Sequence, residues 1–185
     1  MDSKKKWNSK HADRIEQQKQ KEPNPRLIKL APYFTGGTAV DLACGLGANS
    51  VFLAKLNYKV SAVDISDVAV SHVKELADKE NLAIDAFTRD LTNLKQSDME
   101  ENSADLAVIT YYLDRLIFPY IKSIIKKNGF IFIETYYVSP AGNSKVSDNY
   151  KLQPGELLSE FKNWHILFYE ENEHEGRQTI LARKV

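Results

Sequence analysis

Apolar runs and segments with helical spacing alternate along the chain from Pro25 onward, and this pattern predicts most of the secondary structure. Several apolar runs are nearly continuous, which is typical of strands buried on both faces of a sheet. Alternation of the two kinds of segment predicts a doubly wound α/β domain with right-handed crossovers. The predicted strands are 38–43, 59–65, 83–90, 104–110 and 130–138, and the predicted helices are 25–34, 49–57, 66–81 and 115–129.

The end of the chain has a different pattern. Residues 163–172 (NWHILFYEEN) and 177–185 (RQTILARKV) are strand-like runs separated only by the turn sequence EHEG. Two such runs with no helix between them are expected to form an antiparallel hairpin. The sequence therefore predicts an α/β fold with a mostly parallel seven-stranded sheet and a C-terminal antiparallel hairpin.

The beginning of the chain is polar and charged. Trp7, His11 and Ile15 recur at every fourth position, which would place them on one face of a helix. Residues up to Lys6 are expected to form a disordered tail. The predicted domain organisation is an N-terminal polar segment, 1–24, followed by one domain, 25–185.

Charge and cysteine content narrow the class of protein. Lys plus Arg and Asp plus Glu both number 25, so the chain lacks the basic excess that nucleic-acid binding requires. Cys44 is the only cysteine, which excludes an intrachain disulfide and fits a reducing compartment. No apolar run approaches the roughly 18 residues of a membrane helix, and no apolar segment follows the first lysines as in a signal peptide. We expect a cytoplasmic protein with no nucleic-acid or membrane partner.

The stretch AVDLACGLGANS, residues 39–50, contains the most informative turn. Ligands of open α/β sheets bind at the carboxyl ends of the strands, where Gly45 and Gly47 would let a ligand approach the backbone. The string GLGANS lacks the third glycine of a dinucleotide fingerprint, and Asp41 would repel a pyrophosphate on the following helix. A cationic ligand reverses the sign of that interaction. The expected cofactor is therefore S-adenosylmethionine, which has a sulfonium and an α-ammonium.

Further acids follow the next two predicted strands. Asp64 lies at about the distance from Gly47 that a ribose-binding acid needs, although it could equally be a helix cap or a surface acid. Asp90 could accept a hydrogen bond from the adenine amine while Leu91 packs on the ring, or it could be an ordinary loop acid. Three acids at the ends of three successive strands favour cofactor binding over three separate explanations.

With these motifs the chain resembles the class I S-adenosylmethionine-dependent methyltransferases from Pro25 to Val185. The matching stretches are VDLACGLG, AVDIS, TRDL, ADLAVIT and KKNGFIFIETY. The chain is most similar to the small tellurite-resistance-type branch, through YYLDRLIFPYI, QPGELLSEF, TILARK and the opening WNSKH. The resemblance implies a Rossmann-like methyltransferase fold, although Ala43 stands where the family usually has its first glycine.

The cofactor-binding residues that follow from the motifs and the resemblance are Asp41, Ala43, Gly45, Gly47, Asp64, Ile65, Asp90, Leu91 and Thr110. Residues 7–22 are expected to act as a lid over the cofactor, because the apolar stripe of this segment is too thin for a free helix.

The acceptor is expected to bind near the ends of the fourth and fifth strands and the terminal hairpin. Methyl transfer mainly requires positioning, and an acceptor that is already anionic needs no general base. We expect a small, soft or anionic acceptor, such as a thiol or a chalcogen oxyanion. No metal is expected, since the histidines lack metal-ligand spacing. The expected positioning residues are Tyr111, Tyr112, Arg115 and Arg177.

Further candidates and alternatives remain on the acceptor side. Tyr136, Tyr137 and His174 are also candidates, and loop 139–154 is expected to help cover the site. Each tyrosine could instead be a packed aromatic residue. Arg115 could bind an oxyanion through a forked pair of hydrogen bonds or form a surface ion pair with Asp114 or a glutamate. A role for basic residues at the hairpin is implied by the resemblance alone.

Three other functions stay open. An NAD-type oxidoreductase could use the same architecture, but Asp41 and the missing third glycine count against it. A non-catalytic S-adenosylmethionine-binding module would be expected to have lost the cofactor acids, which are present. A methyltransferase acting on a macromolecule would typically need an added recognition domain or a basic face. No pattern indicates the oligomeric state.

Overall fold

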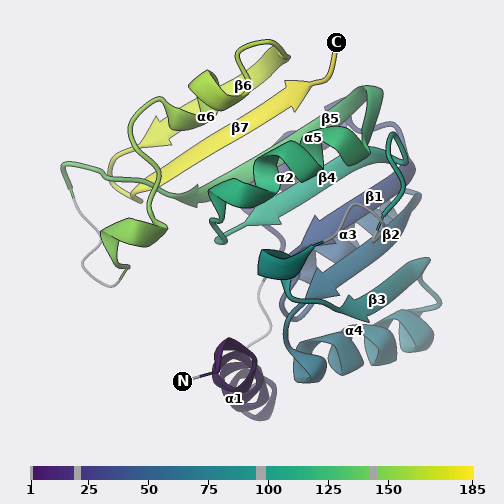
Figure 1. Cartoon of the computed structure of the whole chain (residues 1–185). Helices are drawn as coiled ribbons and strands as arrows, with labels where there is room; N and C mark the ends of the chain where they lie inside the picture. Colours follow the sequence, from purple (N-terminus) through teal and green to yellow (C-terminus); the bar gives the residue numbers. More distant parts are fainter. Residues whose placement is uncertain (1, 19–21, 95–98, 142–145) are drawn as a thin grey trace. The chain divides into compact units, whose positions relative to one another are not determined.

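The computed structural model describes residues 2–18, 22–94, 99–141 and 146–185 (Figure 1). Its seven strands run in the order β3-β2-β1-β4-β5-β7-β6. This mixed α/β sheet confirms the predicted fold class. The chain divides into two compact units, Met1–Lys95 and Gln96–Val185, which are described in turn. No helix of the described residues is long and apolar enough to span a membrane.

The first unit is built on three parallel strands. β1 pairs with β2 and β2 pairs with β3, and α3 and α4 pack on these strands. Its core is formed by fully buried aliphatic side chains such as Leu42, Val60 and Val73. The elements are α1 (Ser3–Glu16), α2 (Pro25–Lys29), η1 (Ala31–Tyr33), β1 (Gly37–Leu42), α3 (Ala48–Lys55), β2 (Tyr58–Asp64), α4 (Asp67–Glu80), β3 (Ile84–Thr88) and η2 (Leu91–Asn93).

The N-terminal segment is helical from Ser3, which corrects the expectation of a disordered tail up to Lys6. Asp2 caps α1 by accepting a hydrogen bond from the Lys4 amide at 3.0 Å. The same lysine pairs with Asp67 at 2.8 Å, so the first turn of α1 is attached to the first turn of α4. The local cap by Asp2 and the tertiary ion pair with Asp67 therefore both support the start of this helix. Residues 19–21 of the predicted N-terminal segment lie outside the described residues.

The second unit contains one parallel and two antiparallel strand pairings. β4 pairs in parallel with β5, and β7 pairs antiparallel with both β5 and β6, which confirms the terminal hairpin. α5 crosses in front of β4 and β5 in Figure 1. The register of β6 on β7 shifts between Ile166 and Phe168, a bulge in the outermost strand. The elements are β4 (Ala104–Thr110), η4 (Arg115–Ile117), α5 (Phe118–Ile124), β5 (Ile125–Tyr136), η5 (Asp148–Tyr150), α6 (Glu156–Glu160), β6 (His165–Asn172) and β7 (Arg177–Arg183).

The helix predicted over 115–129 is shorter than expected. α5 ends at Ile124, and Ile125 already pairs with Ala104 of β4. The sequence KKNG is typical of a helix C-terminus. Here Lys126 instead forms an ion pair with Asp105 at 2.8 Å, next to the first pairing of the two strands. Pairing and burial of Ile125 in the sheet therefore outweigh the preference of Lys126 and Lys127 for a helix C-terminus.

Gly47 is required for packing as well as for backbone conformation. Its φ is +82°, and a Cβ atom built on it would lie 2.7 Å from Val73 Cγ2 of α4. Gly155 has a similar φ of +72°, but a Cβ atom there would meet nothing within 4 Å. An alanine at position 155 would have only the unfavourable left-handed backbone, whereas an alanine at position 47 would also clash with Val73.

We predict that Gly47→Ala destabilises the protein more than Gly155→Ala does. The left-handed backbone costs a non-glycine residue about 1–2 kcal/mol at both positions. The clash with Val73 should add about 1–3 kcal/mol at position 47 alone. Urea unfolding of both variants measures the difference, and Val73→Ala should recover part of the loss in Gly47→Ala. Equal losses in the two glycine variants would contradict the packing role.

Candidate functional site

The turn after β1 is held by backbone hydrogen bonds in a left-handed conformation. Ala43, Gly45 and Gly47 have φ values of +57°, +55° and +82°. The Cys44 amide donates to the Val63 carbonyl at 3.0 Å, and the Gly47 amide donates to the Cys44 carbonyl at 3.1 Å. Ala43 thus adopts the conformation that a glycine would adopt without strain. The turn keeps its shape despite the departure from the usual family sequence.

The two glycines of this turn have different neighbours. The space beside the Gly47 α-carbon is taken by Val73. A Cβ atom on Gly45 would lie 3.4 Å from His11 Cε1 of α1. Glycine at position 47 is therefore explained by packing within the unit, whereas the backbone at Gly45 is covered by the N-terminal helix.

Asp41 is fully buried beneath the glycine turn. Its Oδ2 accepts a hydrogen bond from Ser50 Oγ of α3 at 2.6 Å, and its Oδ1 is buried with no hydrogen-bond partner among the described residues. The pKa of Asp41 is raised to about 7: burial is the main cause, the charge of Asp64 adds to it, and the Ser50 hydrogen bond opposes both. A buried carboxylate oxygen without a donor fits a cationic N–H group of a ligand.

Asp64 joins the end of β2 to two backbone segments. Its Oδ2 accepts a hydrogen bond from the Gly45 amide and its Oδ1 accepts one from the Ser66 amide, both at 2.9 Å. The cap of α4 is Ser66, whose Oγ accepts a hydrogen bond from the Ala69 amide, so Asp64 is not the helix cap. Each carboxylate oxygen can accept one more hydrogen bond, which leaves capacity for a pair of ribose hydroxyls. Ile65 beside it is half-buried.

Asp90 follows β3 and caps a short helix. Its carboxylate accepts hydrogen bonds from the Thr92 amide at 3.0 Å, Thr92 Oγ1 at 2.7 Å and Asn93 Nδ2 at 3.1 Å. The hydrogen bonds from Thr92 are the main cause of the lowered pKa of Asp90. These contacts match the loop-acid alternative. Two other predicted cofactor residues lie nearby in sequence or in the next strand: Leu91 is buried, and Thr110 is the last residue of β4 in the second unit.

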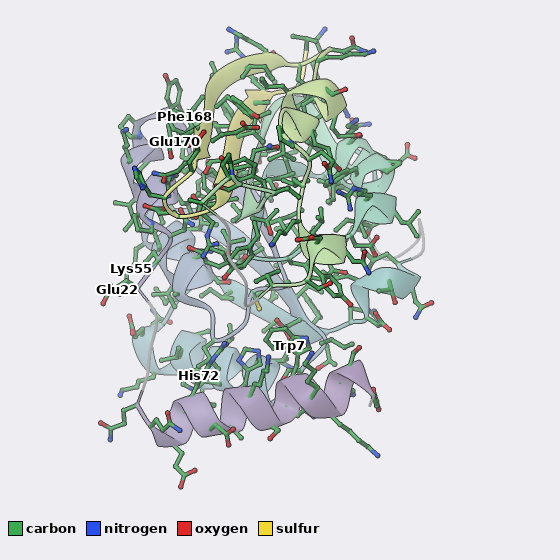
Figure 2. All side chains as sticks on the ribbon, turned by 90° about the vertical axis from the view of Figure 1, so that its left-hand side faces the viewer. Trp7, Glu22, Lys55, His72, Phe168 and Glu170 are labelled. Atoms are coloured by element: carbon green, nitrogen blue, oxygen red, sulfur yellow. The ribbon has the colours of Figure 1, made fainter. Side chains whose placement is uncertain are left out.

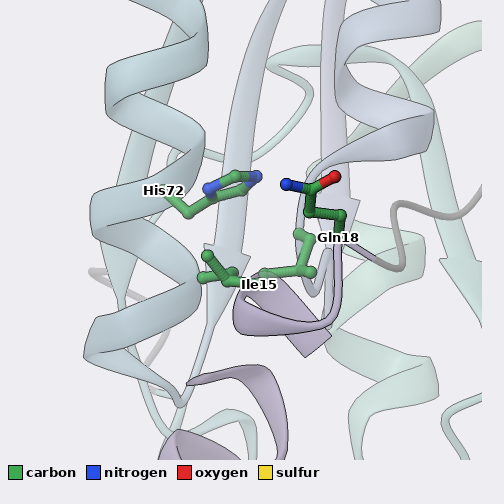
Figure 3. A pocket seen from close by; sticks show the side chains of 4 residues that line it. Ile15, Gln18 and His72 are labelled. Carbon is green, nitrogen blue, oxygen red and sulfur yellow. The ribbon is translucent and has the colours of Figure 1, made fainter. Parts of the chain in front are cut away.

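The helix α1 lies against the glycine turn and α4. Ser66 Oγ donates a hydrogen bond to Asn8 Oδ1 at 2.7 Å, and His11 is buried. Trp7 stacks on His11 with ring centroids 5.6 Å apart, and Trp7 and His72 lie on the same side of α1 (Figure 2). A pocket of about 370 Å³ is lined by Ile15, Gln18, Leu46 and His72 (Figure 3). His72 of α4 therefore faces this pocket.

In the second unit, three predicted or candidate residues come together. The Arg177 guanidinium lies 3.6 Å from the ring centroid of Tyr136 and 4.9 Å from that of Tyr111. The two rings are 6.3 Å apart. Tyr111 has a φ of +59°, and its amide donates to the Glu134 carbonyl at 2.8 Å. We call Tyr111, Tyr136 and Arg177 the arginine cluster.

Other acceptor-side candidates lie elsewhere in the second unit. Tyr112 is half-buried, Tyr137 is buried, and His174 is exposed in the hairpin turn. Residues 142–145 of the predicted covering loop lie outside the described residues. Tyr136, which the sequence left as one of several tyrosines, is the one on which Arg177 stacks, and only its position near the end of a predicted strand pointed to it.

Arg115 forms a forked ion pair with a glutamate of the same unit. Its Nε and Nη2 donate to the two carboxylate oxygens of Glu156 at 2.6 and 2.8 Å, and Nη2 also donates to the Lys151 carbonyl at 3.0 Å. The fork of donors that would bind an oxyanion is occupied by a carboxylate of the protein itself. The alternative of an ion pair with a glutamate is the one that the structure shows.

A family model described as "Tellurite resistance protein TehB" matches residues 24–181. The chain belongs to the TehB family. The match confirms the predicted resemblance to the tellurite-resistance branch of S-adenosylmethionine-dependent methyltransferases.

Two relatives of the chain are methyltransferases by name. The chain is 27% identical over 159 residues to the probable S-adenosyl-L-methionine-dependent methyltransferase TehB of Haemophilus influenzae (strain ATCC 51907 / DSM 11121 / KW20 / Rd), covering 83% of this chain and 54% of that protein. It is 27% identical over 164 residues to phosphoethanolamine N-methyltransferase 1 of Triticum aestivum, covering 84% of this chain and 33% of that protein. The chain thus spans about half the length of the TehB relative that it matches.

Solved structures show the same fold. The crystal structure of TehB from Haemophilus influenzae superposes with a TM-score of 0.74 at 25% identity, covering 88% of this chain and 62% of that chain. A geranyl diphosphate C-methyltransferase from Streptomyces coelicolor A3(2), solved with Mg2+, geranyl diphosphate and S-adenosyl-L-homocysteine, superposes with a TM-score of 0.69 at 12% identity, covering 86% of this chain and 80% of that chain. These likenesses confirm the predicted methyltransferase fold.

We predict that Asp41→Asn stabilises the protein more at pH 8 than at pH 5. A carboxyl whose pKa rises from 3.8 to about 7 on folding contributes stability that is lost as pH rises through that window. The loss is roughly 1.4 kcal/mol per pH unit, so the advantage of the variant should grow by roughly 2–3 kcal/mol between the two conditions. Asparagine can still accept the Ser50 hydrogen bond. Urea unfolding measures the difference, with the exposed Asp85→Asn as control; a pH-independent advantage would contradict the shifted pKa.

Proposed function

We propose that the chain is an S-adenosylmethionine-dependent methyltransferase that acts on a small, soft or anionic acceptor, a thiol or a chalcogen oxyanion. Membership of the TehB family supports the reaction class. The observation that supports the acceptor class most directly is the stacking of Arg177 on Tyr136 and against Tyr111. The site is proposed to work without a metal and without a dedicated general base.

The first unit contains groups that fit the cofactor. Asp41 Oδ1 is a buried acceptor without a donor among the described residues, which suits the α-ammonium of S-adenosylmethionine. Asp64 retains lone pairs for ribose hydroxyls at the end of β2, and Leu91 supplies a buried apolar side chain for the adenine ring. Bound cofactor would supply an electrophilic methyl group on a sulfonium.

The arginine cluster fits an anionic acceptor. Stacking on Tyr136 fixes the plane of the Arg177 guanidinium and leaves its edge for hydrogen bonding. The described residues give this group one long hydrogen bond, from Nη1 to the Glu175 carbonyl at 3.4 Å, out of its five N–H donors. The remaining donors suit the oxygens of an oxyanion or the charge of a thiolate.

The chemistry needs little beyond positioning. Bound S-adenosylmethionine would supply the activated methyl group, and Arg177 and Tyr136 would hold an acceptor whose sulfur, selenium or tellurium lone pair receives it. A thiolate or chalcogen oxyanion carries that lone pair without losing a proton, so no protein base is required. The zero net charge of the chain fits a small-molecule acceptor rather than nucleic acid, and the lone Cys44 fits a reducing compartment.

The test of the function is methyl transfer to a panel of 2-mercaptoethanol, thiophenol, selenite and tellurite, with S-adenosylhomocysteine formation as the readout. Arg177→Ala should lower kcat/KM for the acceptor about ten- to hundredfold, because a hydrogen bond to a charged group is lost. Arg177→Lys should recover only part of the activity, because lysine cannot stack as a plane. Cofactor affinity should stay unchanged in both variants.

Arg183→Lys is the matched control for these variants, because Arg183 lies at the other end of β7 and contacts His165. It should retain wild-type activity, and EDTA should leave all rates unchanged. Turnover of protein or RNA with none of the small acceptors would reject the acceptor class. Cofactor binding without turnover of any acceptor would favour a non-catalytic binding module.

The N-terminal segment, residues 7–22, acts as the cofactor lid in this proposal. Asn8 contacts Ser66, whose amide is bonded to Asp64, and His11 covers Gly45, so α1 touches the groups that would hold the cofactor. Binding of S-adenosylhomocysteine should slow hydrogen exchange in α1, while exchange in α5 stays the same. Asn8→Ala should reduce the slowing. Exchange in α1 that does not respond to the ligand would leave α1 as a purely structural element.

A further inference from the structure

The segment Lys151–Glu156, which we call the strap, connects the parts of the second unit that hold the arginine cluster. We infer that Arg115 is a positioning residue for the acceptor: its ion pair with Glu156 holds the strap so that Tyr136 and Arg177 keep their stacked arrangement. The inference rests on the proposed methyl transfer. It gives Arg115 a role through other residues, in place of direct acceptor contact.

The strap is bonded to the end of β5, where Tyr136 lies. The Leu152 amide donates to the Tyr136 carbonyl at 2.9 Å, and the Val138 amide donates to the Leu152 carbonyl at 2.8 Å. Tyr137 and Leu152 form an isolated parallel bridge. The backbone on both sides of Tyr137 is therefore fixed by a segment distant in sequence.

The strap is also bonded to β7, where Arg177 lies. Gln178, the next residue, is fully buried, and its side-chain Nε2 donates to the Gln153 carbonyl at 3.0 Å. Its Oε1 accepts a hydrogen bond from the Leu157 amide at 2.9 Å, just beyond the strap. Both strands that supply the arginine cluster are thus bonded to the same short segment or to its immediate continuation.

Arg115 provides the connection to the third member of the cluster. It lies four residues after Tyr111, in the segment that follows β4. Its guanidinium binds both oxygens of Glu156 and the Lys151 carbonyl, so it contacts the two ends of the strap at once. Glu156 Oε2 also accepts a hydrogen bond from the Gln153 amide at 2.7 Å, which closes the strap on itself.

The exposure of the pair separates positioning from stability. The Arg115 side chain is 44% exposed and that of Glu156 is 20% exposed. Ion pairs this accessible contribute little to folding. Small displacements of positioning groups, in contrast, change reaction rates strongly. Loss of the pair should therefore affect acceptor use much more than it affects unfolding.

A double-mutant cycle tests the inference, with Arg115→Ala, Glu156→Ala and the double variant. Each single change should raise KM for the most active acceptor of the panel at least fivefold, with the double variant no worse than the singles because the pair acts as a unit. Arg115→Lys should give an intermediate value. The dissociation constant of S-adenosylhomocysteine and the urea midpoint should stay near the wild-type values. Hydrogen exchange at the Leu152 amide should accelerate in every variant.

The matched control is the Lys126–Asp105 pair, which has similar exposure, 40% and 33%, and lies at the amino ends of β4 and β5. Lys126→Ala should leave KM and the exchange of the strap unchanged. Wild-type KM in Arg115→Ala, or additive effects in the cycle, would overturn the positioning role while the proposed function stands. A wild-type protein that methylates no acceptor of the panel would overturn the function itself, and the positioning role with it.

Discussion

The first unit depends on the carboxylate of Asp64. One oxygen accepts a hydrogen bond from the glycine turn after β1, and the other accepts one from the start of α4. A single buried side chain thus forms hydrogen bonds to two loops at once. The hydroxyl of Ser66 extends this set of bonds to α1 through Asn8. A ligand that bonds to Asp64 would therefore be connected through hydrogen bonds to the glycine turn, to the start of α4 and to α1.

The second unit uses stacking for a comparable purpose. A guanidinium needs its plane fixed before its donors can select an oxyanion, and the Tyr136 ring supplies that constraint at little entropic cost. The left-handed backbone of Tyr111 directs its ring toward the same arginine. A strained backbone at such a residue persists because the surrounding hydrogen bonds, including that from the Tyr111 amide to Glu134, hold it.

Much of the fold followed from the sequence because strand and helix patterns depend on local periodicity. The parallel strands and the terminal hairpin were both predictable for that reason. The boundary between α5 and β5 was not, because the pairing of Ile125 with Ala104 is a tertiary contact. The partner of Arg115 lies 41 residues away, and no local pattern indicates which glutamate that is. The sequence could indicate candidate site residues from their positions at the ends of predicted strands. It could not show which of them lie together, such as Arg177 with Tyr136 and Tyr111, because those contacts depend on the three-dimensional fold.

The bulge in β6 has a consequence for the behaviour of the chain in concentrated solution. β6 is the outermost strand of the sheet, and an unprotected outer strand can recruit a strand from another molecule. The shift between Ile166 and Phe168 breaks the regular spacing of backbone groups along it. Farther along the same strand, Glu170 and Glu171 follow one another, with Phe168 and Glu170 labelled in Figure 2. An irregular, acidic border of this kind disfavours intermolecular sheet growth, so this edge should resist aggregation.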